Sequence, residues 1–210
     1  MSGLVSKLKS SSPAIKKFLL WLLMPVNQAR PRIWVKLLMH PLIIKRGKRV
    51  TIRPRTRIDI LPFNKCSIGS DSTIEDFSTV NNGVGDIRIG ERTRIGMGNV
   101  VIGPVTIGSD VMFAQNIVLS GLNHGFEDIS MPPSIQKVST AEIVVEDEVW
   151  IGANAVITAG VRIGKHSVIG AASVVTKNVP PYSVAVGNPA KIIKQYNSET
   201  SKWEKVNKNV

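Results

Sequence analysis

The chain has 210 residues, of which 43% are hydrophobic and 20% charged, and its formal net charge is +12. This length fits one domain with extensions. The single cysteine, Cys66, excludes a framework of intramolecular disulfides and fits a reducing compartment. The apolar run Phe18–Met24 is far shorter than the roughly 20 residues that a membrane-spanning helix needs.

The positive charge is concentrated at the start of the chain. Residues 1–57 contain fourteen Lys and Arg and no acid, which leaves thirteen basic and fifteen acidic residues for the remainder. Nucleic-acid binding would use such charges, but the segment lacks the signature of a recognition helix or an RNA-recognition motif. We therefore expect no nucleic-acid partner.

Residues 1–47 are predicted to form a basic helical segment of one or two short helices, interrupted by Pro25, Pro31 and Pro41. Two interpretations of its apolar side chains are compatible with each other. In the first, four of them cover the end of the following domain: Ile15, Leu19, Leu22 and Leu23. In the second, residues 1–47 rest as an amphipathic, lysine-bearing helix on an anionic membrane face.

Beyond this segment, apolar residues recur at every sixth position in two long runs. The first run is Ile89, Ile95, Val101, Ile107, Phe113 and Leu119, and the second is Val145, Ile151, Ile157, Ile163, Ile169 and Val175. A helix has a period of 3.6 and a half-buried strand a period of 2, so neither explains six. Three short parallel strands per turn of about eighteen residues do explain it. The pattern predicts an all-β solenoid, a left-handed parallel β-helix of hexapeptide repeats, with glycine relieving tight or left-handed backbone at the corners.

We expect this β-helix to occupy residues 48–190 in six to seven turns, with a small insertion at LPFN, residues 61–64. Stacked at the spacing of neighbouring strands, these turns make a prism roughly 30 Å tall. Residues 191–210 are predicted to form a short polar tail with a helix over 201–208.

The repeat stops between Leu119 and Val145, and residues 120–142 have the composition of a projecting loop. A long loop on a rigid scaffold is usually functional. His124 lies at its root, beside Glu127 and Asp128, and an imidazole suits proton transfer at neutral pH. The alternative is a loop histidine that bonds to the backbone.

The other candidate groups favour structural roles. His40 is expected to be structural or solvated, His166 to lie at the surface, and Cys66 to be a small buried side chain. No Walker loop, nucleophile elbow or paired-cysteine metal motif is present. A zinc site of three histidines is not expected, because only His124 and His166 fall in the solenoid. We expect no metal.

From residue 89 to residue 194 the chain resembles the hexapeptide-repeat acetyltransferases, in particular the galactoside, maltose and polysaccharide O-acetyltransferase branch. Four motifs carry the resemblance: NHGFED at 123–128, VWIGANAVI at 149–157, VIGAASVVTK at 168–177 and VPPYSVAVGNPAKII at 179–193. The galactoside and maltose enzymes have proline directly after the histidine, where this chain has Gly125. That departure is more typical of polysaccharide-modifying members.

The resemblance implies a homotrimer that binds acetyl-CoA between neighbouring prisms, with His124 as the general base that activates the acceptor hydroxyl for direct attack on the thioester. It places the remaining family positions on Trp150, Ala153, Ala171, Thr176, Lys177, Lys191 and Lys194 for CoA, and on Asn99 and Asp128 for the acceptor. Trp150 matches a tryptophan near the acceptor end, or else only covers the loop. Asp128 or Glu127 would orient His124, bind sugar hydroxyls or remain solvated.

The leading hypothesis is O-acetylation of a sugar hydroxyl in the biosynthesis of surface polysaccharide or a lipid-linked glycan. The expected location is cytoplasmic, with peripheral contact at the inner face of the membrane. The alternatives are an N-acetyltransferase of a nucleotide sugar, an acetyltransferase of a xenobiotic, and a non-catalytic trimeric scaffold.

Overall fold

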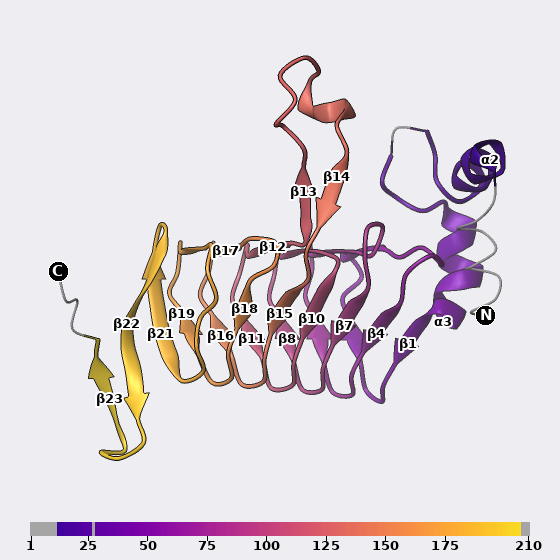
Figure 1. The fold of residues 1–210 in the computed structure, drawn as a ribbon. Helices are drawn as coiled ribbons and strands as arrows, with labels where there is room; N and C mark the ends of the chain where they lie inside the picture. Colours follow the sequence, from indigo (N-terminus) through magenta and orange to yellow (C-terminus); the bar gives the residue numbers. More distant parts are fainter. Residues whose placement is uncertain (1–11, 27, 207–210) are drawn as a thin grey trace.

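The computed structural model describes residues 12–26 and 28–206, which fold into a solenoid of six parallel-stranded turns with a hairpin rising from its side (Figure 1). Each turn contributes one short strand to each of three sheets. The first sheet contains β1 (Ile44–Arg46), β4 (Cys66–Ile68), β7 (Ile87–Ile89), β10 (Val105–Ile107), β15 (Ile143–Val145) and β18 (Arg162–Ile163). The third contains β3 (Arg57–Asp59), β6 (Thr79–Asn81), β9 (Val100–Ile102), β12 (Val118–Ser120), β17 (Val156–Ile157) and β20 (Val174–Val175).

The second sheet is the longest, because two antiparallel strands extend it. Its parallel members are β2 (Thr51–Ile52), β5 (Thr73–Ile74), β8 (Arg94–Ile95), β11 (Met112–Phe113), β16 (Trp150–Ile151), β19 (Val168–Ile169) and β21 (Ser183–Gly187). β22 (Ala190–Asn197) and β23 (Lys202–Lys205) follow in antiparallel pairing. We name the prism edges in chain order: the first edge joins the first and second sheets, the second edge joins the second and third, and the third edge leads back to the first.

The prediction from the six-residue period is confirmed. All twelve side chains of the two runs are 3% exposed or less and lie in one continuous core. The pairing register gives the expected eighteen-residue turn, for example Val105 opposite Ile87 and Val144 opposite Arg162. Burial of a column of β-branched and aromatic side chains therefore holds the solenoid together.

The first turns are longer than eighteen residues and begin earlier than predicted. Ile44 pairs with Cys66, so the solenoid begins at Ile44 rather than at residue 48. The extra residues lie at the third edge, where the buried amide of Asn82 accepts the Leu61 N–H at 2.7 Å and donates to the carbonyls of Leu61 and Asn64. Because these buried polar groups are paired, the insertion costs little.

The described part of the N-terminal segment contains helices. α2 (Pro13–Leu23) begins at Ser12, whose hydroxyl accepts the Ile15 N–H at 3.4 Å. A π-helical turn, η1 (Val35–Met39), continues directly into α3 (His40–Ile43), so Pro41 does not interrupt the helix. None of the helices in the described part of the chain is long and apolar enough to cross a bilayer.

Of the four side chains expected to cover the end of the solenoid, Leu23 is buried and Leu19 is half-buried. Leu23 is 7% exposed and packs with Val35 and Leu61, whereas Ile15 is 51% exposed and Leu22 is 39% exposed. The helix formed by η1 and α3 lies at that end of the solenoid instead, next to β1 (Figure 1).

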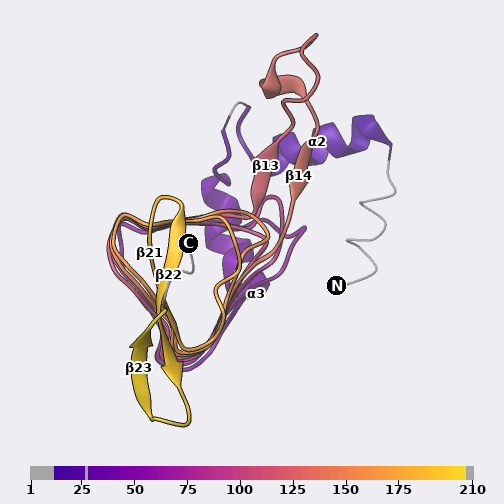
Figure 2. The same cartoon turned by 60° about the vertical axis from the view of Figure 1, so that its left-hand side comes forward.

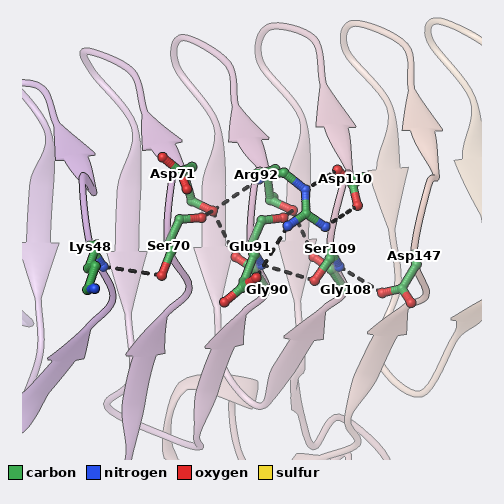
Figure 3. A network of polar contacts seen from close by, with 12 residues as sticks. Lys48, Ser70, Asp71, Gly90, Glu91, Arg92, Gly108, Ser109, Asp110 and Asp147 are labelled. Carbon is green, nitrogen blue, oxygen red and sulfur yellow. Dashed lines mark hydrogen bonds and ion pairs between the residues drawn. The ribbon is translucent and has the colours of Figure 1, made fainter.

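Glycine adopts the predicted left-handed backbone at the second and third edges, in Gly98 and Gly160, whereas the glycines of the first edge serve a different purpose. The left-handed backbone there is adopted by other residues, among them Asp71, Arg92 and Asp110. Gly90 has an ordinary φ, but a Cβ on it would lie 2.4 Å from the carbonyl carbon of Gly108 on the next turn (Figure 3). The stacked turns therefore leave no space for a side chain at this position.

Polar side chains connect the turns along the first edge (Figure 3). Arg92 donates from Nε and Nη2 to the two carboxylate oxygens of Asp110, both at 2.7 Å, and this pairing lowers the pKa of Asp110. The Ser109 N–H donates to Asp147 at 2.7 Å. These contacts fix the register of neighbouring turns at the surface.

The prediction of a C-terminal helix is wrong over the residues that the structure describes. Strand β23 occupies Lys202–Lys205, and Tyr196 of β22 lies opposite Trp203 with ring centroids 5.7 Å apart. The pairing of β22 with β21 makes the segment a continuation of the second sheet. Residues 207 and 208 lie outside the described residues.

Candidate functional site

The predicted loop 120–142 is an ordered hairpin that projects from the third edge (Figures 1 and 2). Its base is an antiparallel ladder of β13 (Leu122–His124) and β14 (Val138–Thr140), in which His124 lies opposite Val138. A 3-10 turn, η2 (Pro133–Ile135), shapes its tip. Backbone pairing thus fixes the position of His124 on an otherwise exposed segment.

The side chain of His124 is exposed and borders a hollow of about 610 Å³. No hydrogen bond or ion pair reaches its ring from any residue that the structure describes. The hollow is lined by Asn123, His124, Gly125, Phe126, Glu127, Lys137 and Ser139. The imidazole is therefore accessible to a hydroxyl-bearing molecule, and polar groups from both strands of the hairpin surround it.

The two acids beside His124 are engaged with their own loop. Asp128 accepts from the N–H and the hydroxyl of Ser130, at 2.9 and 2.6 Å, which lowers its pKa. Glu127 accepts the Phe126 N–H at 3.0 Å, and bonds to this N–H and its own lower its pKa. Neither carboxylate contacts His124, so both shape the loop rather than orient the imidazole.

Lys137 and Ser139 are pocket residues that the sequence did not reveal. They reach the hollow because β14 pairs with β13, and Ser139 lies opposite Asn123. Gly125 makes this approach possible, since a Cβ there would lie 2.8 Å from the Lys137 carbonyl oxygen. The loop sequence shows no clean alternation of polar and apolar residues, so it did not reveal the antiparallel register of β13 with β14 that brings these residues to the hollow.

A second group of predicted positions lies at and near the second edge. Ala153 and Ala171 occupy neighbouring turns, where the Ala172 N–H donates to the Ala153 carbonyl at 2.8 Å. Trp150 is 48% exposed on the outer face of the second sheet. It borders a shallow hollow of about 530 Å³, lined also by Arg94, Met97, Met112 and Gln115.

The lysines and Thr176 are exposed at two separate places. Thr176 and Lys177 follow β20 at the third edge, the same edge from which the hairpin rises, whereas Lys191 and Lys194 lie on β22 of the second sheet. One chain therefore places His124 and Lys177 along one edge, and Trp150, Ala153 and Ala171 around another. It does not bring the two groups together.

Asn99 does not belong to an exposed site. Its side chain is fully buried at the second edge, where its amide donates to the carbonyls of Gly96 at 3.0 Å and Ala114 at 2.9 Å. Because these groups already satisfy it, Asn99 cannot contact an acceptor, and the prediction from the resemblance is corrected.

The remaining candidate groups have structural environments. Burial raises the pKa of Cys66 to about 12, so its thiol is a core side chain. His40 is buried beside the Ile60 carbonyl at 3.1 Å, and His166 pairs with Glu148 at 2.9 Å on the first edge. Among the described residues no group of three or more His, Cys, Asp or Glu is arranged to hold a metal ion.

Two family models match the chain. The model for the bacterial transferase hexapeptide (six repeats) matches residues 142–177, and the model for the hexapeptide repeat of succinyl-transferase matches residues 86–120. The chain is 38% identical over 108 residues to the Escherichia coli protein WbbJ, assigned by name to O-acetyl transfer in lipopolysaccharide biosynthesis, covering 48% of this chain and 55% of WbbJ. It is 41% identical over 93 residues to the galactoside O-acetyltransferase of Escherichia coli, covering 44% of this chain and 45% of that one.

The chain therefore carries hexapeptide repeats of the bacterial transferase type over residues 86–120 and 142–177, and it is similar over part of its length to acetyltransferases built on the same repeat. It spans about half the length of these two relatives. Among solved structures, AntD, an N-acyltransferase from Bacillus cereus in complex with dTDP and 3-hydroxybutyryl-CoA, has a TM-score of 0.64 at 20% identity and covers 79% of this chain and 90% of AntD. A maltose O-acetyltransferase from Clostridium difficile has a TM-score of 0.53 at 24% identity, covering 91% and 89%. These two likenesses concern the fold.

Proposed function

We propose that this protein transfers an acetyl group from acetyl-CoA to a hydroxyl of a sugar or glycan, with His124 as the general base. The observation that carries the proposal is the open hollow at the hairpin base, where the accessible imidazole lies among Asn123, Lys137 and Ser139. Relatives named as O-acetyltransferases support the reaction class.

The chemistry needs a single proton carrier. A ring nitrogen of His124 takes the proton of the acceptor hydroxyl while that oxygen attacks the thioester carbonyl carbon. The tetrahedral intermediate collapses, the carbon–sulfur bond breaks, and the imidazolium returns the proton to the CoA sulfur. An imidazole suits both steps near neutral pH. The products are the acetyl ester and CoA with a free thiol.

We propose that CoA lies along the outer faces that carry the second group of residues. Ala153 and Ala171 leave the coil surface flat beside Trp150, so an extended pantetheine arm can run against the backbone. Thr176 and Lys177 are proposed near the nucleotide end, with Lys191 and Lys194 as cations for the phosphates. For Asp128 we propose only that it lies in the loop near the acceptor.

The separation of these two groups supports a homotrimer. His124 stands on a hairpin at the third edge, while Trp150 and Ala153 lie around the second edge of the same chain. A neighbouring copy that faced this hairpin with its own second edge would complete the site, and cyclic closure satisfies all three interfaces at once. Light scattering of the purified chain tests the assembly, and a monomer that turns over acetyl-CoA would rule it out.

We further propose cytoplasmic-side assembly of surface polysaccharide or lipid-linked glycan as the setting, with peripheral membrane contact through residues 1–47. WbbJ, named for lipopolysaccharide biosynthesis, supports that class of acceptor. The GFED sequence after His124, in place of a proline, favours a polysaccharide acceptor, and the basic N-terminal segment is consistent with a lipid-linked one.

The decisive experiment measures release of the CoA thiol from acetyl-CoA in the presence of an acceptor panel. His124→Ala is expected to lower turnover by roughly 10²- to 10⁴-fold, the usual contribution of a positioned acid–base group. His166→Ala is the matched control, because His166 is also exposed but lies on the first edge. Equal rates for His124→Ala and the unaltered protein would remove the catalytic role and favour the scaffold function.

A second candidate function is N-acetylation of an amino sugar. AntD, which shares the fold, is an N-acyltransferase that was solved with dTDP-4-amino-4,6-dideoxyglucose and CoA. The product distinguishes the two reactions, because hydroxylamine cleaves an acetyl ester and leaves an acetamide intact. An acetylated product that resists hydroxylamine would favour the N-acetyl reaction.

A further inference from the structure

The helix formed by η1 and α3, with Ile33 just before it, carries both buried and strongly exposed side chains. Val35 and His40 are buried against the first turns of the solenoid, at 0% and 6% exposure. Four apolar side chains of this stretch are instead 67–77% exposed: Ile33, Leu37, Leu38 and Leu42. Apolar side chains that remain exposed on a helix already packed on one side indicate a further partner.

α2 adds a second exposed apolar surface. Of its described side chains only Leu23 is buried, and four large ones are 42–59% exposed: Ile15, Phe18, Leu20 and Trp21. The helix is held mainly through its C-terminal end, where Arg32 Nε donates to the Trp21 carbonyl at 3.1 Å and Trp34 Nε1 to the Leu22 carbonyl at 3.3 Å. An eleven-residue helix with so little packing is marginal in water.

We call these eight side chains the apolar N-terminal face: Ile15, Phe18, Leu20, Trp21, Ile33, Leu37, Leu38 and Leu42. So many large apolar side chains left exposed on neighbouring helices mark an interaction site. The segment that carries the face contributes charges of one sign only, since residues 1–57 contain fourteen cations and no acid. Lys17 is exposed on α2, and Lys45 is exposed shortly after the end of α3.

We propose that the apolar N-terminal face docks on the surface of an anionic lipid bilayer. Leucine and aromatic side chains would enter the boundary between headgroups and acyl chains, and the surrounding lysines and arginines would contact the anionic headgroups. The helices are too short to span the bilayer, so the contact is interfacial.

Charge complementarity favours a bilayer over a second copy of the same face. Two copies joined through this face would bring two acid-free, basic segments together, and like charges in contact oppose association. An anionic surface instead offers partners to the exposed cations of the helices, such as Lys17 and Lys45. The inference rests on the membrane location proposed above but not on acetyl transfer.

The test is flotation of the full chain with phosphatidylcholine vesicles, with and without phosphatidylglycerol, at low and high salt. The protein is expected to float with the anionic vesicles and to be released by salt. Leu37→Ser with Leu42→Ser should reduce the floated fraction by about tenfold or more, because these exposed side chains leave the fold intact while losing their insertion. Lys17→Glu with Lys45→Glu should weaken binding to anionic vesicles most strongly at low salt.

The matched control is Ile129→Ser with Ile135→Ser on the hairpin, at 101% and 70% exposure. This pair should keep full vesicle binding, and an equal loss would show that the N-terminal face is not the docking site. Unchanged flotation of the leucine variant would also overturn the proposal, as would failure of the unaltered protein to bind anionic vesicles. A smaller mass by light scattering for the leucine variant, with no vesicle binding by either protein, would assign the face to a second copy. Thiol release measured without vesicles keeps a failure of acetyl transfer distinct from a failure of docking.

Discussion

The amide oxygen of Asn99 accepts the backbone N–H of Ile117 at 2.6 Å, across one turn of the solenoid. The same side chain donates to two carbonyls at the second edge, so one buried amide joins three backbone groups. A polar residue that resembled a binding residue in sequence is therefore an internal connector between turns.

Asn99→Ala is predicted to destabilise the fold by about 2–4 kcal/mol, because it leaves several buried backbone groups without partners. Chemical denaturation followed by circular dichroism measures this loss. The KM for the acceptor should stay within about twofold of the unaltered protein at a temperature where both are folded. A stable variant with a much higher acceptor KM would restore the binding role of Asn99.

Gly90→Ala is predicted to destabilise the protein by about 1–3 kcal/mol, because its Cβ would meet the backbone of Gly108 and the turns would have to move apart. Gly83→Ala is the control, since the nearest atom to its Cβ is the side-chain oxygen of Asn81. Thermal unfolding of both variants checks the difference. Equal melting temperatures would contradict the tight stacking at the first edge.

Lys177→Glu is predicted to raise the KM for acetyl-CoA about tenfold while the assembly remains intact, because it replaces a cation proposed near the CoA phosphates with an anion. Lys65→Glu reverses an equally exposed charge near the other end of the solenoid. Steady-state kinetics and light scattering of both variants provide the measurement. Unchanged KM values for both variants would show that the CoA phosphates do not bind near Lys177.

The stability of the protein is predicted to decrease as the pH falls below about 6.5, because of His40. Burial lowers the pKa of His40 from its ordinary 6.5, and the nearby cations Lys36 and Arg46 lower it further. Below pH 6.5 the unfolded chain therefore binds a proton at His40 that the folded chain does not bind. The stability that neutral His40 contributes is complete above pH 6.5 and is lost as the pH falls toward the pKa of the folded state.

His40→Gln should remove this part of the pH dependence while its amide still donates to the Ile60 carbonyl. Thermal unfolding between pH 8 and pH 5 is the measurement. Burial raises the pKa of the neighbouring Asp59, which gives the opposite trend at acid pH, so the difference between the two proteins isolates His40. Parallel curves for both proteins would show that another group governs this range.

The repetitive parts of this protein could be predicted from the sequence, because in a solenoid the period of the apolar residues along the chain is also the period of the strands in the fold. Each inward position, such as Ile107 or Ile163, contacts only its own turn and the two neighbouring turns, so a period of six in the chain becomes one buried column. The break in that period also located the hairpin and, with it, His124.

Features that depend on non-repeating contacts were not predictable. The register of β13 with β14 brings Lys137 and Ser139 beside His124, and antiparallel pairing with β21 turns the expected C-terminal helix into strands. Both outcomes are decided by which backbone groups meet across the fold rather than by local propensity.

Length, charge distribution and the six-residue period by themselves determined a three-sided solenoid with a basic N-terminal segment and one projecting histidine. Only the tertiary structure decided that Asn99 faces inward, that the N-terminal leucines remain exposed, and that His124 stands at the third edge while Trp150 lies on the second sheet. The physical reason is that the burial of a side chain depends on its neighbours in the folded protein. The same asparagine or leucine is buried or exposed according to residues that lie a turn or a helix away.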